Sequence, residues 1–447
     1  MDGTLLRERR VYTCQARGGG AADASGFDVH YHRLELTLDP AVRYVQGVVT
    51  TGFTAREPVQ QLAFDLATAL AVDSVVFAGA QVLFEHTDDV LRIPLALTMP
   101  TGTADSVRIH YHGVPDPTGM GSFVTDVRDG SPVLWTLSEP YGAKDWWPCK
   151  QHLADKVDSL DLIVHHPTGY RAVGNGVRIA ETDGGGTTTV HWRHRYPIAY
   201  YLIATAVADY AVLEHTLQQA GPDVPMLSFA YPANAYMASL AAGDVQRQLP
   251  ILSALFGPYP FSNEQYGHAE FGWSGGMEHQ TMTFLGVYHF EITAHELAHQ
   301  WFGNRVTCGS WQDIWLNEGF ATYLSGLVLE DTEYWAGWKR GKVGHVTEQP
   351  GGSVHCADTT DIDRLFDARL SYNKGAMVLH MLRWVIGDSA FFQGCRNYLN
   401  DPALAYGTAR TADLQAHLEA TSGMDLSPFL ADWFTGDRSR GIAPLLE

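Results

Sequence analysis

The spacing of apolar residues changes once along this chain of 447 residues, and the change divides its fold in two. Over residues 28–212, apolar and polar residues alternate, as at Leu34, Leu36 and Leu38, and this period of two is typical of β-strands with one buried face. Over residues 213–447, apolar residues recur at helical spacing instead. The chain therefore predicts a multidomain α+β fold, in which an all-β N-terminal domain of residues 28–212 precedes a mostly α domain of residues 213–447.

Helical spacing is clearest in five segments of the second half, at residues 237–255, 292–302, 320–330, 374–386 and 412–420. Between the first two, residues 266–284 are rich in glycine and aromatic residues and alternate partly. We expect an edge strand or extended loop there, which gives the α domain a small sheet with an exposed edge. Residues 1–27 end in a run rich in glycine and alanine without periodicity, which predicts a flexible leader.

The charge balance limits the partners of this chain. Its 50 acidic and 30 basic residues give a formal charge of −20, which repels nucleic acid phosphates and anionic lipid headgroups. No stretch approaches the roughly 18 apolar residues of a membrane-spanning helix, and the N-terminus has no apolar run like that of a signal peptide. Five scattered cysteines without a C-x-x-C pair argue against a disulfide framework. We expect a cytoplasmic protein with neither a nucleic acid nor a membrane partner, and no sequence feature specifies an oligomeric state.

A metal-binding motif lies in one of the predicted helices. His295, Glu296 and His299 form an H-E-x-x-H pattern. Side chains four residues apart share a helix face, so both imidazoles can reach one zinc ion at roughly 2.0 to 2.1 Å. With 20 histidines and 50 acidic residues in the chain, chance alone gives the pattern about 0.1 times. A zinc site therefore needs support from a third ligand.

Glu318 is the expected third ligand. The residues between His299 and Glu318 suffice for one helix to end and another to return beside it. Glu296 lies about 100° around the helix from its neighbour in sequence, so it can face the ion without binding it. We predict that Glu296 is the general base, which takes a proton from zinc-activated water. A closed structural zinc site is an alternative, but only three good ligands are visible and no cysteine has suitable spacing.

In these motifs the chain resembles the zinc aminopeptidases of the aminopeptidase N and leukotriene hydrolase family. The matching signature is H-E-L-A-H-Q-W-F-G at 295–303 followed by W-L-N-E-G-F-A at 315–321. Residues 275–279 look like the family's G-x-M-E-N motif, and residues 372–376 look like its Y-x-K-G-A motif. The segment from Glu139 to Cys149 is similar to a glutamate-containing segment of its β domain.

The resemblance implies a fold, a cofactor and a reaction. Such gluzincins have a saddle-like all-β domain followed by a thermolysin-like, mostly α catalytic domain with a small edge-exposed sheet. His295, His299 and Glu318 would bind one Zn²⁺ ion. The implied activity is zinc-dependent hydrolysis of N-terminal residues from peptides that have a free N-terminus.

The resemblance also implies how a peptide is held. Glu139 and Glu278 would bind the α-ammonium, because carboxylates one residue's length from the zinc select this charge over a blocked terminus. Gly275, Gly276 and Met277 would present backbone to the substrate, as an edge strand does when a peptide adds to a sheet. Small residues permit that close approach.

Tyr372 would donate its hydroxyl to the developing oxyanion, which can contribute roughly 3 kcal/mol when the donor is preorganised. Two positions depart from the family pattern. His279 replaces its asparagine, and Leu137 stands where relatives often have glutamine. With these two departures the resemblance still implies amine recognition, but it does not specify the fine geometry of that contact.

Family members usually continue into a helical C-terminal domain that covers the active site, whereas this chain ends at Glu447. From its length we expect a short form without that domain and with a more open site. The alternative to a strict aminopeptidase is a peptide-processing protease with both endo- and aminopeptidase activity, for example on leader peptides. Epoxide hydrolysis, known in one branch of the family, is a third alternative. The intact base, ligands and tyrosine argue against a non-catalytic peptide-binding module.

Overall fold

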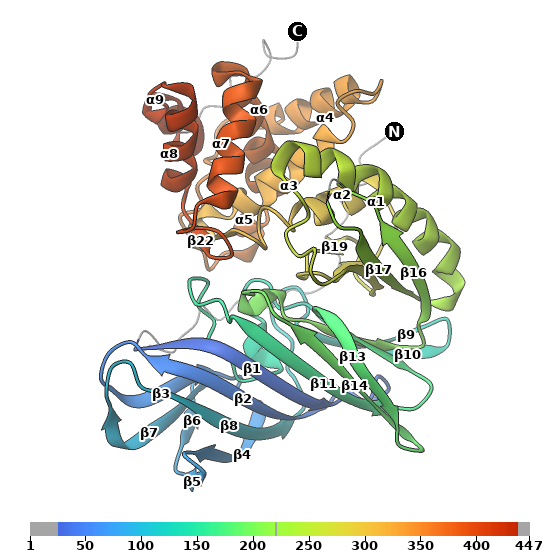
Figure 1. The fold of residues 1–447 in the computed structure, drawn as a ribbon, viewed down its shortest axis with the longest axis vertical. Helices are drawn as coiled ribbons and strands as arrows, with labels where there is room; N and C mark the ends of the chain where they lie inside the picture. Colours follow the sequence, from blue (N-terminus) through green and yellow to red (C-terminus); the bar gives the residue numbers. More distant parts are fainter. Residues whose placement is uncertain (1–25, 220, 437–447) are drawn as a thin grey trace.

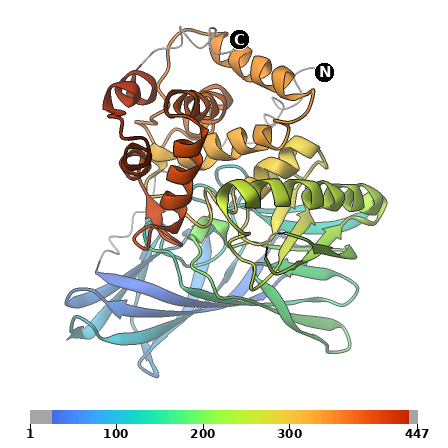
Figure 2. The same cartoon turned by 45° about the horizontal axis from the view of Figure 1, so that its top comes forward.

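The computed structural model describes residues 26–219 and 221–436. The predicted leader of residues 1–27 lies outside this part of the chain except for its last two residues, and Phe27 belongs to a strand and is buried. Strands fill the lower half of Figure 1 and helices the upper half, and the turned view of Figure 2 keeps the two groups apart. This arrangement confirms the predicted multidomain α+β fold, with a β-rich N-terminal region followed by a mostly helical one.

Three sheets make up the β-rich region. The largest has the strand order β13-β14-β11-β1-β2-β8-β4-β5 and consists of β1(Phe27–Thr37), β2(Val45–Ala55), β4(Leu70–Phe77), β5(Ala80–Val82), β8(Ala104–Gly113), β11(Ser159–Pro167), β13(Val177–Asp183) and β14(Thr187–His194). A smaller sheet has the order β3-β7-β6, with β3(Val59–Asp65), β6(Glu85–Thr87) and β7(Val90–Met99). The other has the order β12-β15-β10-β9, with β9(Phe123–Arg128), β10(Ser131–Thr136), β12(Arg171–Gly174) and β15(Thr205–Ala208).

β1 shows how the alternating pattern forms the core of this region. It pairs in parallel with β11 and antiparallel with β2, so Leu34 lies opposite both Leu162 and Val49. All three side chains are fully buried, whereas Arg33 and Thr37 on the other face of β1 are exposed. The period of two therefore sets which face of the strand packs inward.

The helical region contains two small sheets. The five-stranded sheet has the order β16-β17-β18-β20-β19, with β16(Ala211–Leu217), β17(Val224–Ala230), β18(Tyr266–Glu270), β19(Gly276–Met277) and β20(Thr283–Leu285). The other pairs β21(Thr307–Cys308) with β22(Thr408–Ala409). β19 is the terminal strand of the five-stranded sheet, so one of its edges has no neighbouring strand among the described residues. The predicted division between residues 212 and 213 falls within β16 and stays a prediction.

The α-helices are α1(Ala235–Phe256), α2(Phe290–Ala298), α3(Trp315–Leu327), α4(Trp335–Thr347), α5(Ile362–Leu365), α6(Gly375–Ile386), α7(Asp388–Asn400), α8(Thr411–Ser422) and α9(Ser427–Leu430). The described residues also form two π-helical turns, η6(Ala368–Lys374) and η7(Ala431–Thr435), and the 3₁₀ turns η2(Ala143–Asp145), η3(Tyr200–Leu202), η4(Pro232–Asn234) and η5(Trp311–Asp313). α3 is buried along its whole length, because α2, α4, α6 and η6 pack around it. Within the described ranges, no helix is long and apolar enough to cross a membrane.

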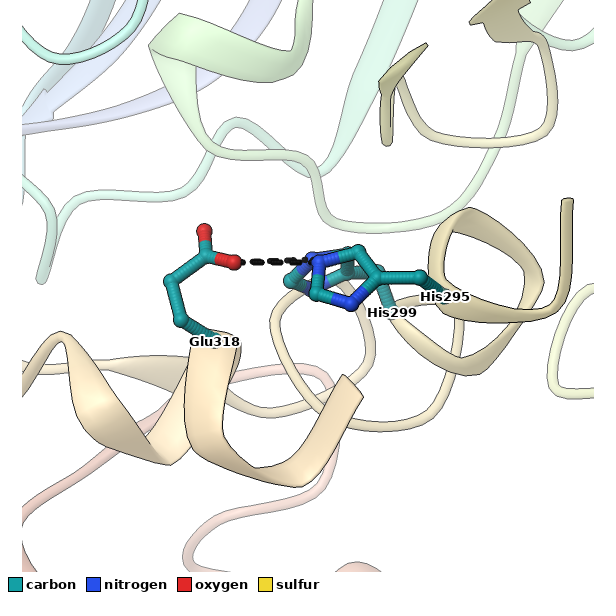
Figure 3. Close-up of side chains that lie close together, drawn as sticks. All are labelled: His295, His299 and Glu318. Carbon is teal, nitrogen blue, oxygen red and sulfur yellow. Dashed lines mark hydrogen bonds and ion pairs between the residues drawn. The ribbon is translucent and has the colours of Figure 1, made fainter. Parts of the chain in front are cut away.

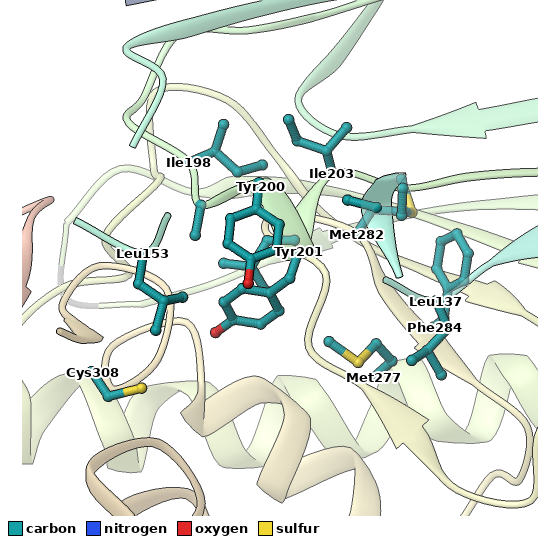
Figure 4. Packing of buried hydrophobic residues seen from close by; sticks show 14 of the residues in the cluster. Leu137, Leu153, Ile198, Tyr200, Tyr201, Ile203, Met277, Met282, Phe284 and Cys308 are labelled. Carbon is teal, nitrogen blue, oxygen red and sulfur yellow. The ribbon is translucent and has the colours of Figure 1, made fainter. Parts of the chain in front are cut away.

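One hydrophobic core continues from the β-rich region into the helical region. Tyr200 and Tyr201 on η3, Met277 of β19 and Cys308 of β21 belong to this one buried cluster (Figure 4). The Tyr200 hydroxyl donates a hydrogen bond to the carbonyl of Pro140 at 2.6 Å. This hydrogen bond holds the segment around Glu139 against η3.

Candidate active site

His295 and His299 on α2 and Glu318 on α3 bring three potential ligand atoms together (Figure 3). His295 lies in the last turn of α2, His299 at its C-terminal end, and Glu318 in the first turn of α3. The Nε2 atoms of the two histidines are 3.1 Å apart. Oε2 of Glu318 lies 3.2 Å from Nε2 of His295 and 3.4 Å from Nε2 of His299. The three atoms form a nearly equilateral triangle.

This triangle fits a tetrahedral zinc site. Ligand atoms about 2.0 to 2.1 Å from a zinc ion at tetrahedral angles lie about 3.3 Å from one another. The observed separations of 3.1, 3.2 and 3.4 Å are close to that value. Two imidazoles and one carboxylate are also the donor set of catalytic zinc sites that keep a fourth position open.

Hydrogen-bond partners hold the histidine rings in this orientation. Nδ1 of His299 lies 3.1 Å from the carbonyl oxygen of Phe302, and Nδ1 of His295 lies 3.5 Å from Oγ1 of Thr322. A proton on each Nδ1 satisfies both contacts, so Nε2 is the nitrogen of each ring that remains to bind a metal ion. The second contacts of the rings thus favour the tautomer that binds a metal.

The electrostatic field of the site favours a cation. Potential ligand atoms of Glu278, Glu296 and His299 lie within 4.8 Å of one another, as do those of Glu139, Glu278 and Glu318. Burial acts to lower the pKa of His299, but the charges of Glu278 and Glu318 outweigh it and raise this pKa to about 10. Burial acts to raise the pKa of Glu318, yet His299 and His295 lower it to about 2. Four carboxylates around two imidazoles therefore attract positive charge.

The predicted base, Glu296, packs directly against β19. A Cβ atom added to Gly276 would lie 2.5 Å from both Cγ and Oε1 of Glu296 and 2.6 Å from its Cδ. Such distances are shorter than van der Waals contact, so only glycine fits at position 276 with Glu296 in this place. The close contact with β19 therefore limits where the side chain of Glu296, the predicted base, can lie.

Glu139 and Glu278 lie beside the triangle, although they come from different regions of the fold. Glu139 follows β10, and Glu278 follows β19. Oε1 of each is buried and has no hydrogen-bond partner among the described residues. Burial raises the pKa of Glu278 to about 7 and that of Glu139 well above its usual value. Buried acceptors without donors are rare in proteins, so these two oxygens face a position where a donor is expected.

Tyr372 reaches the site from η6. Its ring stacks on that of His295, with a centroid separation of 5.8 Å and an interplanar angle of 14°. η6 continues into α6, and α6 packs closely on α3. This close packing is seen at Gly319, where a Cβ atom would lie only 3.0 Å from the backbone of Gly375. π-Helical turns are frequent at functional sites, and this one brings the tyrosine over a predicted ligand.

The two positions that depart from the family pattern lie in the core. His279 is buried with its ring centroid 4.4 Å from that of Phe284, and burial lowers its pKa to about 3. The histidine is therefore neutral. Leu137 is also buried, in the cluster shown in Figure 4.

The contacts that hold the loop after β19 were not predicted. Nδ2 of Asn304 donates a hydrogen bond of 2.7 Å to the carbonyl oxygen of Glu278, and Nε2 of Gln300 donates one of 3.4 Å to the same atom. Both amides belong to the H-Q-W-F-G-N run that begins at His299. Their position in sequence next to the H-E-x-x-H motif suggests a role near the site, but it does not predict that they bind the carbonyl oxygen of Glu278.

Comparisons with known proteins agree with this geometry. The model of the peptidase family M1 domain matches residues 287–433. The chain is 26% identical over 343 residues to a leucyl aminopeptidase of Saccharolobus solfataricus, which covers 71% of this chain and 42% of that protein. It is 29% identical over 459 residues to the mitochondrial aminopeptidase 2 of Saccharomyces cerevisiae, which covers 91% of this chain and 46% of that protein. The chain thus spans about half the length of the curated relatives it matches.

Solved structures match over most of their length. An M1 zinc metallopeptidase from Deinococcus radiodurans superposes with a TM-score of 0.83 at 27% identity, covering 92% of this chain and 94% of that one. A variant of that protein bound to a Tyr-Ser-Ala substrate gives a TM-score of 0.82 at 26% identity, with 92% and 95% covered. Similar structures include a two-domain M1 zinc metallopeptidase variant bound to L-arginine.

Proposed function

We propose that this chain, a member of peptidase family M1, is a zinc-dependent aminopeptidase that removes N-terminal residues from peptides. One observation supports this above all: Oε1 of Glu139 and Oε1 of Glu278, which accept no hydrogen bond from the described residues, belong to carboxylates beside the histidine and glutamate triangle. A peptide N-terminus is a cation with N–H donors, and it satisfies both the charge and the hydrogen-bonding needs of these carboxylates. A chain held there by its first amino group places its first peptide bond nearest the triangle.

The cofactor is one zinc ion, for which His295, His299 and Glu318 are the proposed ligands. When bound, zinc supplies Lewis acidity, which polarises a carbonyl and makes water more acidic. Glu296 is the proposed general base. Its carboxylate lies within 4.8 Å of potential ligand atoms of both His299 and Glu278, so it faces the space between the triangle and the bound amine.

The remaining residues would align the substrate. Gly275, Gly276 and Met277 offer backbone groups at the open edge of the five-stranded sheet, where an extended peptide can add as a strand. Tyr372, stacked over His295, would donate its hydroxyl to the oxygen that gains negative charge. The contact from Tyr372 would strengthen as the carbonyl carbon becomes tetrahedral and its oxygen gains charge, which lowers the barrier, whereas the backbone contacts would hold the peptide in place throughout.

We also propose a cytoplasmic location. Cys149, Cys308, Cys356 and Cys395 are buried free thiols in the described part of the chain. Free thiols are typical of reducing compartments, where disulfides are rare. Fractionation of the native host, with detection of this chain in the soluble intracellular fraction, tests this point.

The activity can be tested with one peptide in two forms. A peptide of about ten residues with a free N-terminus should lose residues stepwise, whereas its N-acetylated form should stay intact, as mass spectrometry of the products would show. A chelator should stop the reaction, and added zinc should restore it.

Other outcomes lead to different conclusions. Internal cleavage of the acetylated form would show the alternative function, a processing peptidase with endopeptidase activity. Cleavage that survives complete removal of the metal would refute the zinc mechanism.

A further inference from the structure

Lys156 belongs to the N-terminal region, and its buried amino group contacts the loop that follows α2. The residue lies just before β11 and is 8% exposed. Its Nζ donates a hydrogen bond of 2.7 Å to the carbonyl oxygen of Asn304 and one of 3.4 Å to that of Arg305. These two residues begin five positions after His299 in sequence. The lysine therefore contacts the catalytic loop directly across the boundary between the two regions.

A lysine is a costly choice for this position. Among the described residues no carboxylate lies within ion-pair distance of it, in contrast to Lys150, which is equally buried and pairs with Asp155 at 2.5 Å. A buried charge without a counter-charge opposes folding, and an apolar side chain of the same length would fill the space without that penalty. What the lysine adds over an apolar residue is its hold on the two carbonyl oxygens.

Asn304, which Lys156 holds, contacts the backbone of both His299, a proposed zinc ligand, and Glu278, a proposed ligand of the α-ammonium. Its backbone N–H donates a hydrogen bond of 2.9 Å to the carbonyl of His299. Its side-chain amide donates one of 2.7 Å to the carbonyl of Glu278. Asn304 is fully buried, so neither contact competes with water. A shift of Asn304 would therefore move the backbone of Glu278.

The position of the Glu278 carboxylate depends on this backbone. Oε1 of this carboxylate has no hydrogen-bond partner among the described residues, so no contact of Oε1 with them holds the carboxylate in place. We propose that Lys156 is a positioning residue, which holds Asn304 and thereby places the Glu278 carboxylate where the α-ammonium of a peptide is bound. This inference rests on the proposed aminopeptidase function, because it assigns Lys156 to the recognition of the same amine.

The test measures binding separately from catalysis. Tyr-Ser-Ala and its N-acetyl form would be titrated by calorimetry into zinc-loaded Glu296→Gln protein, with and without Lys156→Met. We expect Lys156→Met to weaken binding of the free peptide about tenfold, because the displaced Glu278 carboxylate makes a poorer charge-assisted contact with the α-ammonium. Binding of the acetylated peptide and the zinc content should stay unchanged. With Glu296 restored, KM for the free peptide should rise by a similar factor while kcat changes less than about twofold.

A double-mutant cycle identifies the route of the effect. In a Glu278→Gln background, Lys156→Met should weaken binding of the free peptide by less than about twofold, because the carboxylate that it positions is already neutral. Lys150→Met is the matched control, since it removes an equally buried lysine of the same region that contacts Phe27 and Asp155 instead. Asn304→Ala removes the next link and should reproduce the effect of Lys156→Met, which keeps the test open if the lysine variant fails to fold.

Two results would overturn the inference. One is equal weakening of the free and acetylated peptides by Lys156→Met, and the other is a full effect that persists in the Glu278→Gln background. Failure of the proposed function looks different, because the parent protein would then bind the free and acetylated peptides equally well before any change at Lys156.

Discussion

The contact between Gly276 and Glu296 makes the replacement Gly276→Ala a direct test of how the proposed base is positioned. The new methyl group would lie 2.5 Å from Cγ and Oε1 of Glu296, whereas an ordinary contact is about 3.5 Å or more between carbon atoms. The side chain must therefore retreat by about 1 Å, and it is only 5% exposed, so there is little open space around it. A misplacement of about 1 Å can cost roughly 100-fold in rate, which corresponds to about 2.7 kcal/mol.

The assay compares kcat/KM and zinc content of the wild-type and Gly276→Ala proteins. We expect kcat/KM for a free peptide to fall about 100-fold while zinc stays bound, because the atoms nearest the new methyl group all belong to Glu296. Gly341→Ala is the control, since its methyl group on α4 meets nothing within 4 Å. It should leave the rate unchanged and raise the free energy of unfolding by up to about 1 kcal/mol. A Gly276→Ala protein with full zinc and a rate within threefold of wild type would refute the idea that Gly276 fixes the base.

Three further predictions follow from other contacts. Glu296→Gln should retain zinc, measured by atomic emission, and lose at least about 1,000-fold in kcat, because the amide cannot accept a proton. Thr322→Val should weaken zinc binding about tenfold in competition with a chelator, because Nδ1 of His295 loses its partner. Burial lowers the pKa of Lys156 to about 7, so between pH 7 and 10 the unfolded chain binds more protons there and the free energy of unfolding rises with pH. Relative to Lys156→Met, the wild type should gain on the order of 4 kcal/mol over this range in denaturant titrations, and parallel stability curves would contradict this.

The sequence predicted elements well where one period dominates. α2 and α3 were expected at residues 292–302 and 320–330 and are found at Phe290–Ala298 and Trp315–Leu327. α4 and α7 were not predicted. α4 contains three glycines, and its buried side chains are confined to Trp338, Val343 and Val346, so its apolar pattern is weak. A π-helical turn such as η6 follows neither period and has no pattern of its own.

In the candidate site, contacts between residues close in sequence could be predicted, whereas contacts between distant residues could not. Spacing alone predicts that His295 and His299 share a face, since four residues make about one turn of a helix. No spacing rule predicts that Gly276 touches Glu296, or that Lys156 binds the carbonyl of a residue 148 positions away. Those contacts depend on how sheets and helices pack, and packing is decided by many side chains at once.

The two tasks of the site draw on different amounts of the fold. The proposed zinc ligands come only from α2, its C-terminal end and α3, which β21 and η5 connect, whereas the carboxylates proposed to bind the amine are Glu139 of the N-terminal region and Glu278 of the helical region. Two hydrogen bonds from the N-terminal region also hold the loop after Glu278. Nδ2 of Asn175 donates one of 2.8 Å to the carbonyl oxygen of Gln280, and the N–H of Gly176 donates one of 2.7 Å to Oγ1 of Thr281. Any movement between the two regions would therefore change the distance between the paired carboxylates while leaving the three ligand atoms together. Under the proposed function, selection for a free N-terminus, and not metal binding, depends on the rigid joining of the two regions.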